Sequence, residues 1–197
     1  TAERGFSFMR SGPLDMRMDN SQGQSAAEWL RIADESEIAR VLKDYGEERY
    51  AKRIARALVA TRDVEPLETT QALANLIERV SPSRDHHKHP ATRAFQAIRI
   101  QVNRELEDLE RCLTEVPELL KISGRLVVIS FHSLEDRIVK YFFTNFSKNK
   151  SRPSRYLPEN KVIETALFNE YKNKVFRPSK NEINHNSRSR SAKLRFA

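Results

Sequence analysis

The chain has 197 residues, of which 39% are hydrophobic and 31% are charged, which suits one ordinary domain or two small ones around a modest core. Its formal net charge is +8. Residues 148–197 hold 13 Lys/Arg against 4 Asp/Glu, whereas residues 1–147 hold 22 Lys/Arg against 23 Asp/Glu. Such a basic stretch suggests a polyanion partner, most often nucleic acid, and the alternative is a solvated tail. No apolar run approaches the ~20 residues of a membrane span, and no signal-peptide pattern opens the sequence, so we expect a cytoplasmic protein with no membrane partner.

The first part of the chain predicts a loop followed by a bundle of short helices. Residues 1–24 hold three of the five glycines and a proline, which is typical of irregular structure. Ser25 and Glu28 have the spacing of a capping box, which predicts the start of a helix. Amphipathic periodicity then predicts further short helices over roughly 36–45, 47–61 and 70–80.

The next helix should be the longest of the chain. Pro90 opens it, and Pro117 ends or kinks it. Apolar residues recur between them at spacings of three or four: Phe95, Ile98, Val102, Leu106, Leu109 and Leu113. The single cysteine, Cys112, lies in this pattern, so we expect a buried or half-buried thiol, and a lone cysteine excludes an internal disulfide framework.

The character of the sequence then changes towards strands. RLVVISF (125–131) is a short, β-branched run, which predicts a strand buried on both faces, as in a parallel sheet. The residues that follow predict a helix with Ser133 as its N-cap and Asp136 in its first turn. Residues 147–187 are polar, basic and poor in periodicity. The last segment, SAKLRF (191–196), alternates and predicts a strand that buries Ala192, Leu194 and Phe196.

This order of elements indicates an α/β fold of which the chain holds a part. Helix, turn, buried strand and helix follow one another as in a doubly wound fold. One central strand and one short terminal strand are too few to build a parallel sheet. We therefore expect strand edges and apolar surface to be exposed in this chain.

Five long segments, in order, resemble the MraW family of ribosomal RNA small subunit methyltransferases H. They are AERGFSFMRSGPLDMRMD, DYGEERYAKRIARALV, HPATRAFQAIRIQVNRELEDLE, GRLVVISFHSLEDRIVKYF and RPSKNEINHNSRSRSAKLR. The resemblance implies a class I, Rossmann-like methyltransferase sheet with an inserted all-helical domain, mostly helical in this chain. It also implies S-adenosyl-L-methionine as cofactor, and methyl transfer to the N4 amine of a cytosine in 16S rRNA.

The resemblance further implies partners and boundaries. The partner is 16S rRNA in the small ribosomal subunit, and a homodimer is left open. Residues 1–21 would continue an active-site loop from an upstream half, 22–88 would be the inserted helical domain, and 89–197 would be the C-terminal part of the methyltransferase domain, with a basic segment at 147–190. The family's glycine-rich cofactor loop would precede Thr1, and the chain contains no G-x-G. No cofactor-binding residue is therefore assigned here, and the alternative is an inactive, truncated remnant that binds RNA or the ribosome.

Candidate site residues follow from the chemistry of the cytosine amine, whose lone pair is delocalised into the ring. The base must be held, and the amine needs a proton acceptor. Asp15 and His132 are the candidates for catalysis, although Asp15 could equally pair with Arg10 or Arg17. The candidates for substrate binding are Arg4, Phe6, Phe8, Arg17, His89, Arg93, Ser130 and His132.

Several of these assignments have alternatives. Phe6 and Phe8 either stack on a base or anchor their loop in the core. Ser130 and His132 follow a strand, and ligands bind outside the carboxyl ends of strands in open α/β sheets; a Ser-His-Asp hydrolase is rejected because no G-x-S-x-G is present. The histidines at 86, 87 and 89 lack the ligand pattern of a zinc site, so no metal is assigned, and an RNA-facing loop is preferred.

The sequence also departs from the family at one turn. The usual PGGR is Ile122-Ser123-Gly124-Arg125 here. Because serine replaces a glycine, we expect this turn to be loosened.

Overall fold

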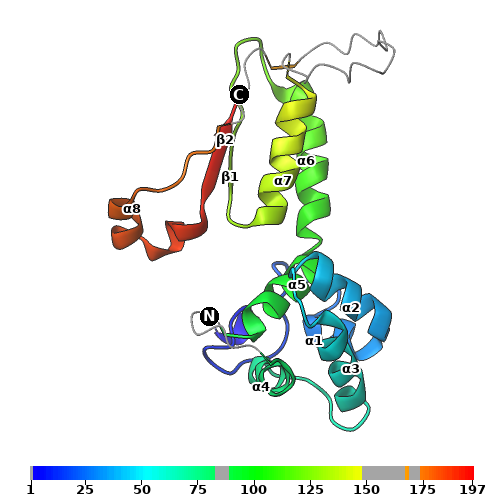
Figure 1. Ribbon diagram of the computed structural model, residues 1–197. Helices are drawn as coiled ribbons and strands as arrows, with labels where there is room; N and C mark the ends of the chain where they lie inside the picture. The colour runs from blue at the N-terminus through cyan, green and yellow to red at the C-terminus, as the bar shows by residue number, and fades with distance from the viewer. Residues whose placement is uncertain (1, 83–88, 148–166, 169–173) are drawn as a thin grey trace, which may run out of the picture. The chain divides into compact units, whose positions relative to one another are not determined.

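The computed structural model describes residues 2–82, 89–147, 167–168 and 174–197, which form a mostly helical chain with a small two-stranded sheet (Figure 1). It divides into two compact units, which we call the helical unit, Thr1–Glu105, and the sheet unit, Leu106–Ala197. No helix among the described residues is long and apolar enough to cross a membrane.

The helical unit confirms the predicted bundle. After a 3-10 turn at Ala2–Arg4, its helices are α1 (Ala26–Ile32), α2 (Glu35–Asp44), α3 (Ala51–Arg62), α4 (Thr70–Val80) and α5 (Ala91–Asn103). The capping box is present: the Glu28 N–H donates to Ser25 Oγ at 3.2 Å, and the Ser25 N–H donates to Glu28 Oε2 at 2.8 Å. α3 begins later than predicted, because Glu47 has a φ of 49° and the chain turns before it can become helical.

The core of the helical unit includes part of the N-terminal loop as well as all five helices. Leu14 and Met16 are 1% and 0% exposed and belong to the same apolar cluster as Ile38, Leu42, Ile54, Leu73 and Ile98. Main-chain hydrogen bonds fasten the loop to the helices: the Ala27 N–H donates to the Leu14 carbonyl at 2.8 Å, and the Thr70 N–H donates to the Gly12 carbonyl at 2.9 Å. The loop is therefore irregular but firmly held.

The single long helix predicted after Pro90 is wrong, because the chain breaks it into two helices. α5 ends at Asn103, Arg104 adopts a left-handed φ of 52°, and α6 begins at Glu105. Arg99 closes the break with a two-bond ion pair to Glu105, at 2.7 and 2.8 Å. The apolar periodicity continues across the break, which is why the sequence alone predicts one helix.

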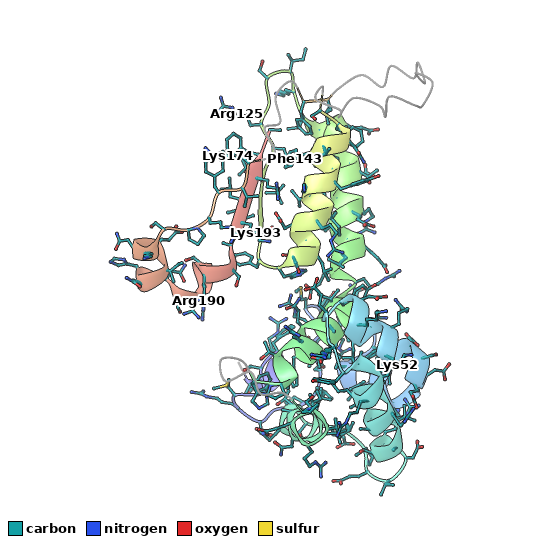
Figure 2. The ribbon with its side chains drawn as sticks, viewed as in Figure 1. Lys52, Arg125, Phe143, Lys174, Arg190 and Lys193 are labelled. Carbon is teal, nitrogen blue, oxygen red and sulfur yellow. The ribbon has the colours of Figure 1, made fainter. Side chains whose placement is uncertain are left out.

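The sheet unit pairs two long helices with the sheet. Its elements are α6 (Glu105–Leu119), β1 (Val127–Ser130), α7 (Ser133–Asn145), α8 (Lys180–His185), a 3-10 turn η2 (Ser187–Ser191) and β2 (Lys193–Phe196). α6 and α7 lie side by side next to the strands, and Phe143 of α7 points towards the sheet (Figures 1 and 2). The buried cluster between them contains Leu113, Val139, Phe142, Phe143 and Phe168. α8 was not foreseen, since it lies in the segment predicted to lack periodicity.

The prediction that the first strand is buried on both faces in a parallel sheet is wrong for this chain. β1 pairs antiparallel with β2, with Val127 opposite Phe196. Val128 packs against the cluster beneath α7, but Val127 and Ile129 are 56% and 55% exposed. One face of the sheet is thus uncovered in the part of the chain that the structure describes, as expected for a piece of a larger sheet.

The prediction for the last strand is also wrong about which face is buried. Phe196 is 43% exposed and Leu194 is half-buried, whereas Arg195 is only 4% exposed. Arg195 Nε donates to Asp136 Oδ1 at 2.6 Å, and Lys193 Nζ lies 3.3 Å from Asp136 Oδ2. An ion pair with α7, rather than an apolar contact, decides which side of β2 faces inward.

Cys112 is exposed, contrary to the prediction. The buried side of α6 is formed by Leu113, with Leu109 and Val116 packed against the same cluster. Cys112 precedes Leu113 and therefore points to a different side of the helix.

A strained turn joins α6 to β1. The Gly124 N–H donates to the Lys121 carbonyl at 2.8 Å, and Ser123 has a φ of 66°. A positive φ at the third residue is that of a type II turn, which favours glycine. The turn is formed, but serine occupies a position whose positive φ favours glycine.

We expect Ser123→Gly to raise the free energy of unfolding by about 0.5–1 kcal/mol. The left-handed conformation costs a side-chain-bearing residue roughly 1–2 kcal/mol, and the additional entropy that glycine loses offsets about half of that gain. Chemical denaturation followed by circular dichroism measures the difference. Ser36→Gly in α2 should instead lower the stability, and a destabilised Ser123→Gly variant would contradict the strain argument.

Candidate functional site

Seven of the predicted site residues lie in the helical unit: five on the N-terminal loop, and His89 and Arg93 around the start of α5. The loop turns sharply at Gly5, whose φ is 71° and where a Cβ atom would lie 2.5 Å from the Pro13 carbonyl oxygen. Only glycine allows this close approach of two loop segments. The approach brings Arg4 onto the far end of the loop, where its guanidinium donates to the carbonyls of Arg17 and Met18 at 3.2 and 2.6 Å.

Asp15 and Arg17 form the ion pair that the sequence offered as one alternative. Arg17 Nε and Nη2 donate to the two carboxylate oxygens of Asp15 at 2.8 and 2.7 Å, and the Arg17 N–H donates to Oδ1 at 3.0 Å. The hydrogen bonds from Arg17 lower the pKa of the Asp15 carboxyl and outweigh the opposing effect of burial. Asp15 is thus held as a carboxylate, which accepts hydrogen bonds readily but takes up a proton weakly.

Because its pKa is lowered on folding, Asp15 should stabilise the chain above its unfolded pKa of about 3.9. This contribution should disappear as the pH falls through the lowered pKa of the folded state. Arg17→Gln should move the pKa of Asp15 back towards the unfolded value. Carboxyl carbon shifts followed by NMR against pH measure this directly, with Asp136 of the same spectrum as an internal reference, since Arg17 does not contribute to its pKa. An unchanged Asp15 midpoint in Arg17→Gln would contradict the assignment.

Phe6 and Phe8 both anchor the loop, and Phe8 also forms part of an aromatic group near the surface. Both side chains are half-buried against the core of the helical unit. The Phe8 ring lies 4.5 Å from the ring of His89 and 4.8 Å, edge on, from that of Phe95. The Arg4 guanidinium lies 5.1 Å from the ring centre of Phe6. The anchoring role that the sequence left open is therefore present, while His89 remains exposed.

The helical unit also carries exposed cations among and near the predicted site residues. Arg10 and Arg93 are exposed, and the Arg93 guanidinium points to the Glu47 carbonyl at 3.5 Å. His89 Nδ1 accepts the Ala91 N–H at 3.1 Å, at the start of α5. The histidines at 86 and 87 lie outside the described residues.

Asn103, which no pattern in the sequence marks, fixes the end of the loop that carries Asp15 and Arg17. Its Nδ2 donates to the Met16 carbonyl at 2.7 Å and to the Arg99 carbonyl at 2.8 Å, and its Oδ1 accepts the Met18 N–H at 2.7 Å. The side chain thereby pairs with the main chain on both sides of Arg17. Only its place at the break between two helices, visible in the structure, could have identified it.

Ser130 and His132 lie in the sheet unit, where β1 ends and α7 begins. Ser130 is 3% exposed, and its Oγ donates to the Lys193 carbonyl of β2 at 3.4 Å. His132, and not Ser133, is the N-cap of α7, which corrects the prediction: Nδ1 of His132 accepts the Glu135 N–H at 3.3 Å. A histidine nitrogen thus does here what a serine hydroxyl usually does.

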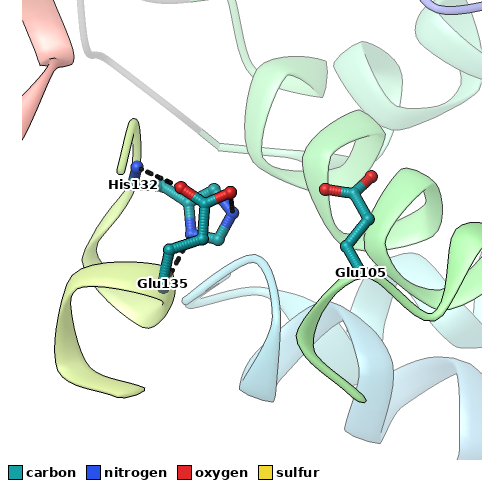
Figure 3. A group of neighbouring side chains, drawn as sticks. All are labelled: Glu105, His132 and Glu135. Atoms are coloured by element: carbon teal, nitrogen blue, oxygen red, sulfur yellow. Dashed lines mark hydrogen bonds and ion pairs between the residues drawn. The ribbon is translucent and has the colours of Figure 1, made fainter. Parts of the chain in front are cut away.

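Glu135 completes this second capping box, which Figure 3 shows. Its Oε2 accepts the N–H groups of Phe131 and His132 at 2.7 and 3.2 Å, and its Oε1 lies 3.2 Å from Nε2 of His132. Burial raises the pKa of Glu135, but hydrogen bonds from the His132 ring and the Phe131 N–H lower it by more, so the net change is downward. His132 is consequently fixed in place by its partner.

Asp136, one residue further on, is the charged contact between α7 and β2. Hydrogen bonds from Arg195 lower its pKa against the effect of burial, with a smaller contribution from Lys193. The two neighbouring carboxylates therefore have separate tasks. Glu135 shapes the start of α7, and Asp136 fastens it to the sheet.

Comparisons with known proteins found similar sequences that match over the whole chain. The sequence model of one family, described as the MraW methylase family, matches residues 1–197. The chain is 54% identical over 197 residues to a protein of Thioalkalivibrio sulfidiphilus, 53% over 201 residues to one of Idiomarina loihiensis and 52% over 197 residues to one of Shewanella loihica. Each relative is called ribosomal RNA small subunit methyltransferase H. Each alignment covers the whole of this chain but only 62%, 62% and 63% of the relative.

Proposed function

Because the chain belongs to the MraW methylase family, we propose that it is part of an S-adenosylmethionine-dependent methyltransferase that acts on the N4 amine of a cytosine in the RNA of the small ribosomal subunit. The observation that carries the proposal is the match over the whole chain to relatives that are named ribosomal RNA small subunit methyltransferase H. The chain spans less than two thirds of their length, so the activity is proposed for a polypeptide of the relatives' length that contains it.

In this proposal the N-terminal loop meets the target base. Asp15 accepts a hydrogen bond from the cytosine amine and orients it, since its lowered pKa favours acceptance of a hydrogen bond over uptake of a proton. The half-buried Phe8 and exposed His89 offer aromatic surface for an unstacked base. Arg10 and Arg93, both exposed, are placed on the same unit for contact with phosphate.

The residues in the sheet unit have a supporting part in the same proposal. Ser130 and His132 end a strand and begin a helix, which is where ligands bind in open α/β sheets. We propose that β1 is a strand of a Rossmann-like sheet and that α7 packs on that sheet. The face of the sheet that exposes Val127 and Ile129 would be covered in the longer polypeptide. The predicted domain boundaries at 21/22 and 88/89 refer to that complete fold; within this chain, the compact helical unit also includes α5.

The residues of this chain do not fit the cofactor by themselves. The sequence has no G-x-G, and glycine-rich loops are what let a main chain approach a bound nucleotide closely. We propose that the residues that hold S-adenosylmethionine lie outside these 197 residues. Calorimetric titration should show no heat of binding with the chain and one-to-one binding with the longer polypeptide. One-to-one binding by the chain alone would overturn this part of the proposal.

Transfer of a labelled methyl group tests the activity itself. The longer polypeptide should transfer label from S-adenosylmethionine to RNA in small ribosomal subunits that lack the modification. Subunits that already carry it should accept no label. If no label reaches RNA although the cofactor binds, the alternative holds, namely an inactive protein that still contacts the ribosome.

A further inference from the structure

The sheet unit carries a group of exposed cations, which we call the C-terminal cationic surface. It consists of Lys174, Arg177, Lys180, Arg188 and Arg190, all of them exposed. Between residues 174 and 192 the only acidic residue is Glu182. Arg190 is seen to project from η2 in Figure 2. Self-repulsion among these cations makes such a surface unfavourable unless an anion offsets it.

The segment that bears these cations is ordered by its own local contacts. The main chains of Phe176 and Leu194 exchange hydrogen bonds of 3.0 and 2.9 Å, which anchors the segment on β2. Ser179 caps α8 by accepting the Glu182 N–H at 3.1 Å. Asn186 caps η2 by accepting the Arg188 N–H at 3.2 Å. The cations are therefore carried on a defined main chain rather than on a loose tail.

The geometry of η2 turns its arginines outward. Ser189 is 7% exposed, and its hydroxyl donates to the Asn186 carbonyl at 2.8 Å. Arg188 and Arg190 flank this buried serine and both remain exposed. The fold thus buries the middle residue of Arg-Ser-Arg and leaves a guanidinium free on each side of it.

The arginines of this surface differ from the basic residues of the neighbouring strand. Lys193 and Arg195 are held by Asp136 at 3.3 and 2.6 Å and are part of the structure of the sheet unit. Within the described ranges, Arg188 and Arg190 have no ion pair with an acidic side chain. Their charge is therefore available to a ligand.

We propose that the C-terminal cationic surface binds the phosphates of an RNA strand, outside the contacts made by the N-terminal loop. The proposal rests on the proposed function, and it adds a second point of contact to it. The planar guanidinium of arginine matches phosphate with two parallel hydrogen bonds, and serine hydroxyls and main-chain N–H groups commonly accompany it in nucleic-acid interfaces. The alternating Ser-Arg-Ser-Arg-Ser of η2 supplies these groups together.

An RNA fits this surface better than a membrane does. A helix that lies on a membrane needs a broad apolar face opposite its basic face. α8 has the sequence KNEINH and offers only Ile183 as an apolar residue. α8 therefore has the charge for an anion but lacks the apolar face that binding to lipid requires.

The test is the salt dependence of RNA binding by the longer polypeptide with Arg188→Gln and Arg190→Gln combined. Binding to a fluorescent fragment of small-subunit rRNA is measured between about 50 and 200 mM salt. Each lost contact to a single strand should reduce the slope of log K against log salt by about 0.7, so the double variant should lose about 1.4. The variant with lysine at both positions should restore the slope, since it keeps the charge.

Lys52→Gln with Arg53→Gln is the matched control, because it removes two exposed cations from α3 in the helical unit. It should leave the slope unchanged. An unchanged slope in the Arg188/Arg190 variant, or an equal loss in the control, would overturn the proposal, as would binding to anionic vesicles as tight as to RNA. If the wild-type protein methylates rRNA but the double variant keeps the wild-type salt slope, only the proposed RNA contact of this surface is refuted. If the wild-type protein does not methylate rRNA, the proposed function is refuted, whatever the salt slope of the double variant.

Discussion

Asp136→Ala should lower the free energy of unfolding of the chain by about 3–5 kcal/mol, the largest stability effect that we expect from a single substitution. The reason is the position of Arg195, whose side chain is 5% exposed and lies 2.6 Å from the Asp136 carboxylate. Without Asp136, the buried guanidinium of Arg195 and the neighbouring Lys193 lose the carboxylate that faces both of them, and removal of one partner of a buried ion pair is costly. Urea denaturation followed by circular dichroism measures the loss.

Two further variants separate this ion pair from a general effect of charge. Asp108→Ala removes the partner of Arg111 in an ion pair whose side chains are 63% and 80% exposed, and it should change stability by no more than about 0.5 kcal/mol. Asp136→Ala combined with Arg195→Met should recover most of the loss, because the buried charge is then gone. A single Asp136→Ala variant within about 1 kcal/mol of the wild type would show that Arg195 is not buried as the structure has it.

Asn103→Ala should have the largest effect on the N-terminal loop. The substitution removes three hydrogen bonds, two of which hold the main chain at Met16 and Met18. With a net value near 1 kcal/mol for each of these two bonds, local opening should become easier by about 2 kcal/mol, which corresponds to roughly thirtyfold faster exchange of the Met18 amide hydrogen. Hydrogen exchange followed by NMR or mass spectrometry gives this number without any assay of activity.

Asn103→Asp distinguishes the two sides of the amide. The aspartate keeps an oxygen for the Met18 N–H but loses the donor to the Met16 carbonyl, so the Met18 amide should stay protected while the loop is still weakened. Asn75→Ala is a suitable control, because Asn75 is an exposed asparagine of α4 in the same unit. If exchange at Met18 is the same in Asn103→Ala and in the wild type, Asn103 does not hold the loop.

Local sequence signals predicted most of the helical unit. Its helices follow from apolar periodicity, and the Ser25–Glu28 capping box lies within four residues, so both partners are visible together. The pair of Asp15 and Arg17 was also foreseen as one alternative, because the two residues are neighbours in the chain. In these two cases the deciding residues lie close together in the chain, and the sequence was sufficient.

Two of the errors arise where distant residues decide the outcome. The break after Asn103 depends on loop residues 85 and 87 positions away, and these contacts leave no trace in the apolar pattern. The burial of Arg195 depends on Asp136, 59 positions away. An alternating pattern predicts which residues share a face of a strand, but not which face is covered. For β1 the pattern suited a sheet buried on both sides, whereas this chain supplies a cover for one side only.

The same distinction applies to the candidate site. The segment AERGFSFMRSGPLDMRMD identified the loop and its charged and aromatic residues. The contact of Phe8 with His89 and the role of Asn103 are visible only in the structure. His132 was singled out as a site residue, yet its ring caps α7, a task that the sequence assigned to Ser133. Preferences for N-caps favour serine, and nothing in the local sequence shows that the histidine ring would take its place.

The measurement that tests the account most directly is identification of the methylated nucleoside. Small ribosomal subunits that lack the modification are treated with the longer polypeptide and S-adenosylmethionine, and their RNA is digested and analysed by mass spectrometry against synthetic methylcytidines. The account predicts N4-methylcytidine at a single position of the small-subunit RNA. Methylation at a ring carbon, at the ribose or at another base would contradict the proposed chemistry of the N-terminal loop, in which Asp15 orients an exocyclic amine.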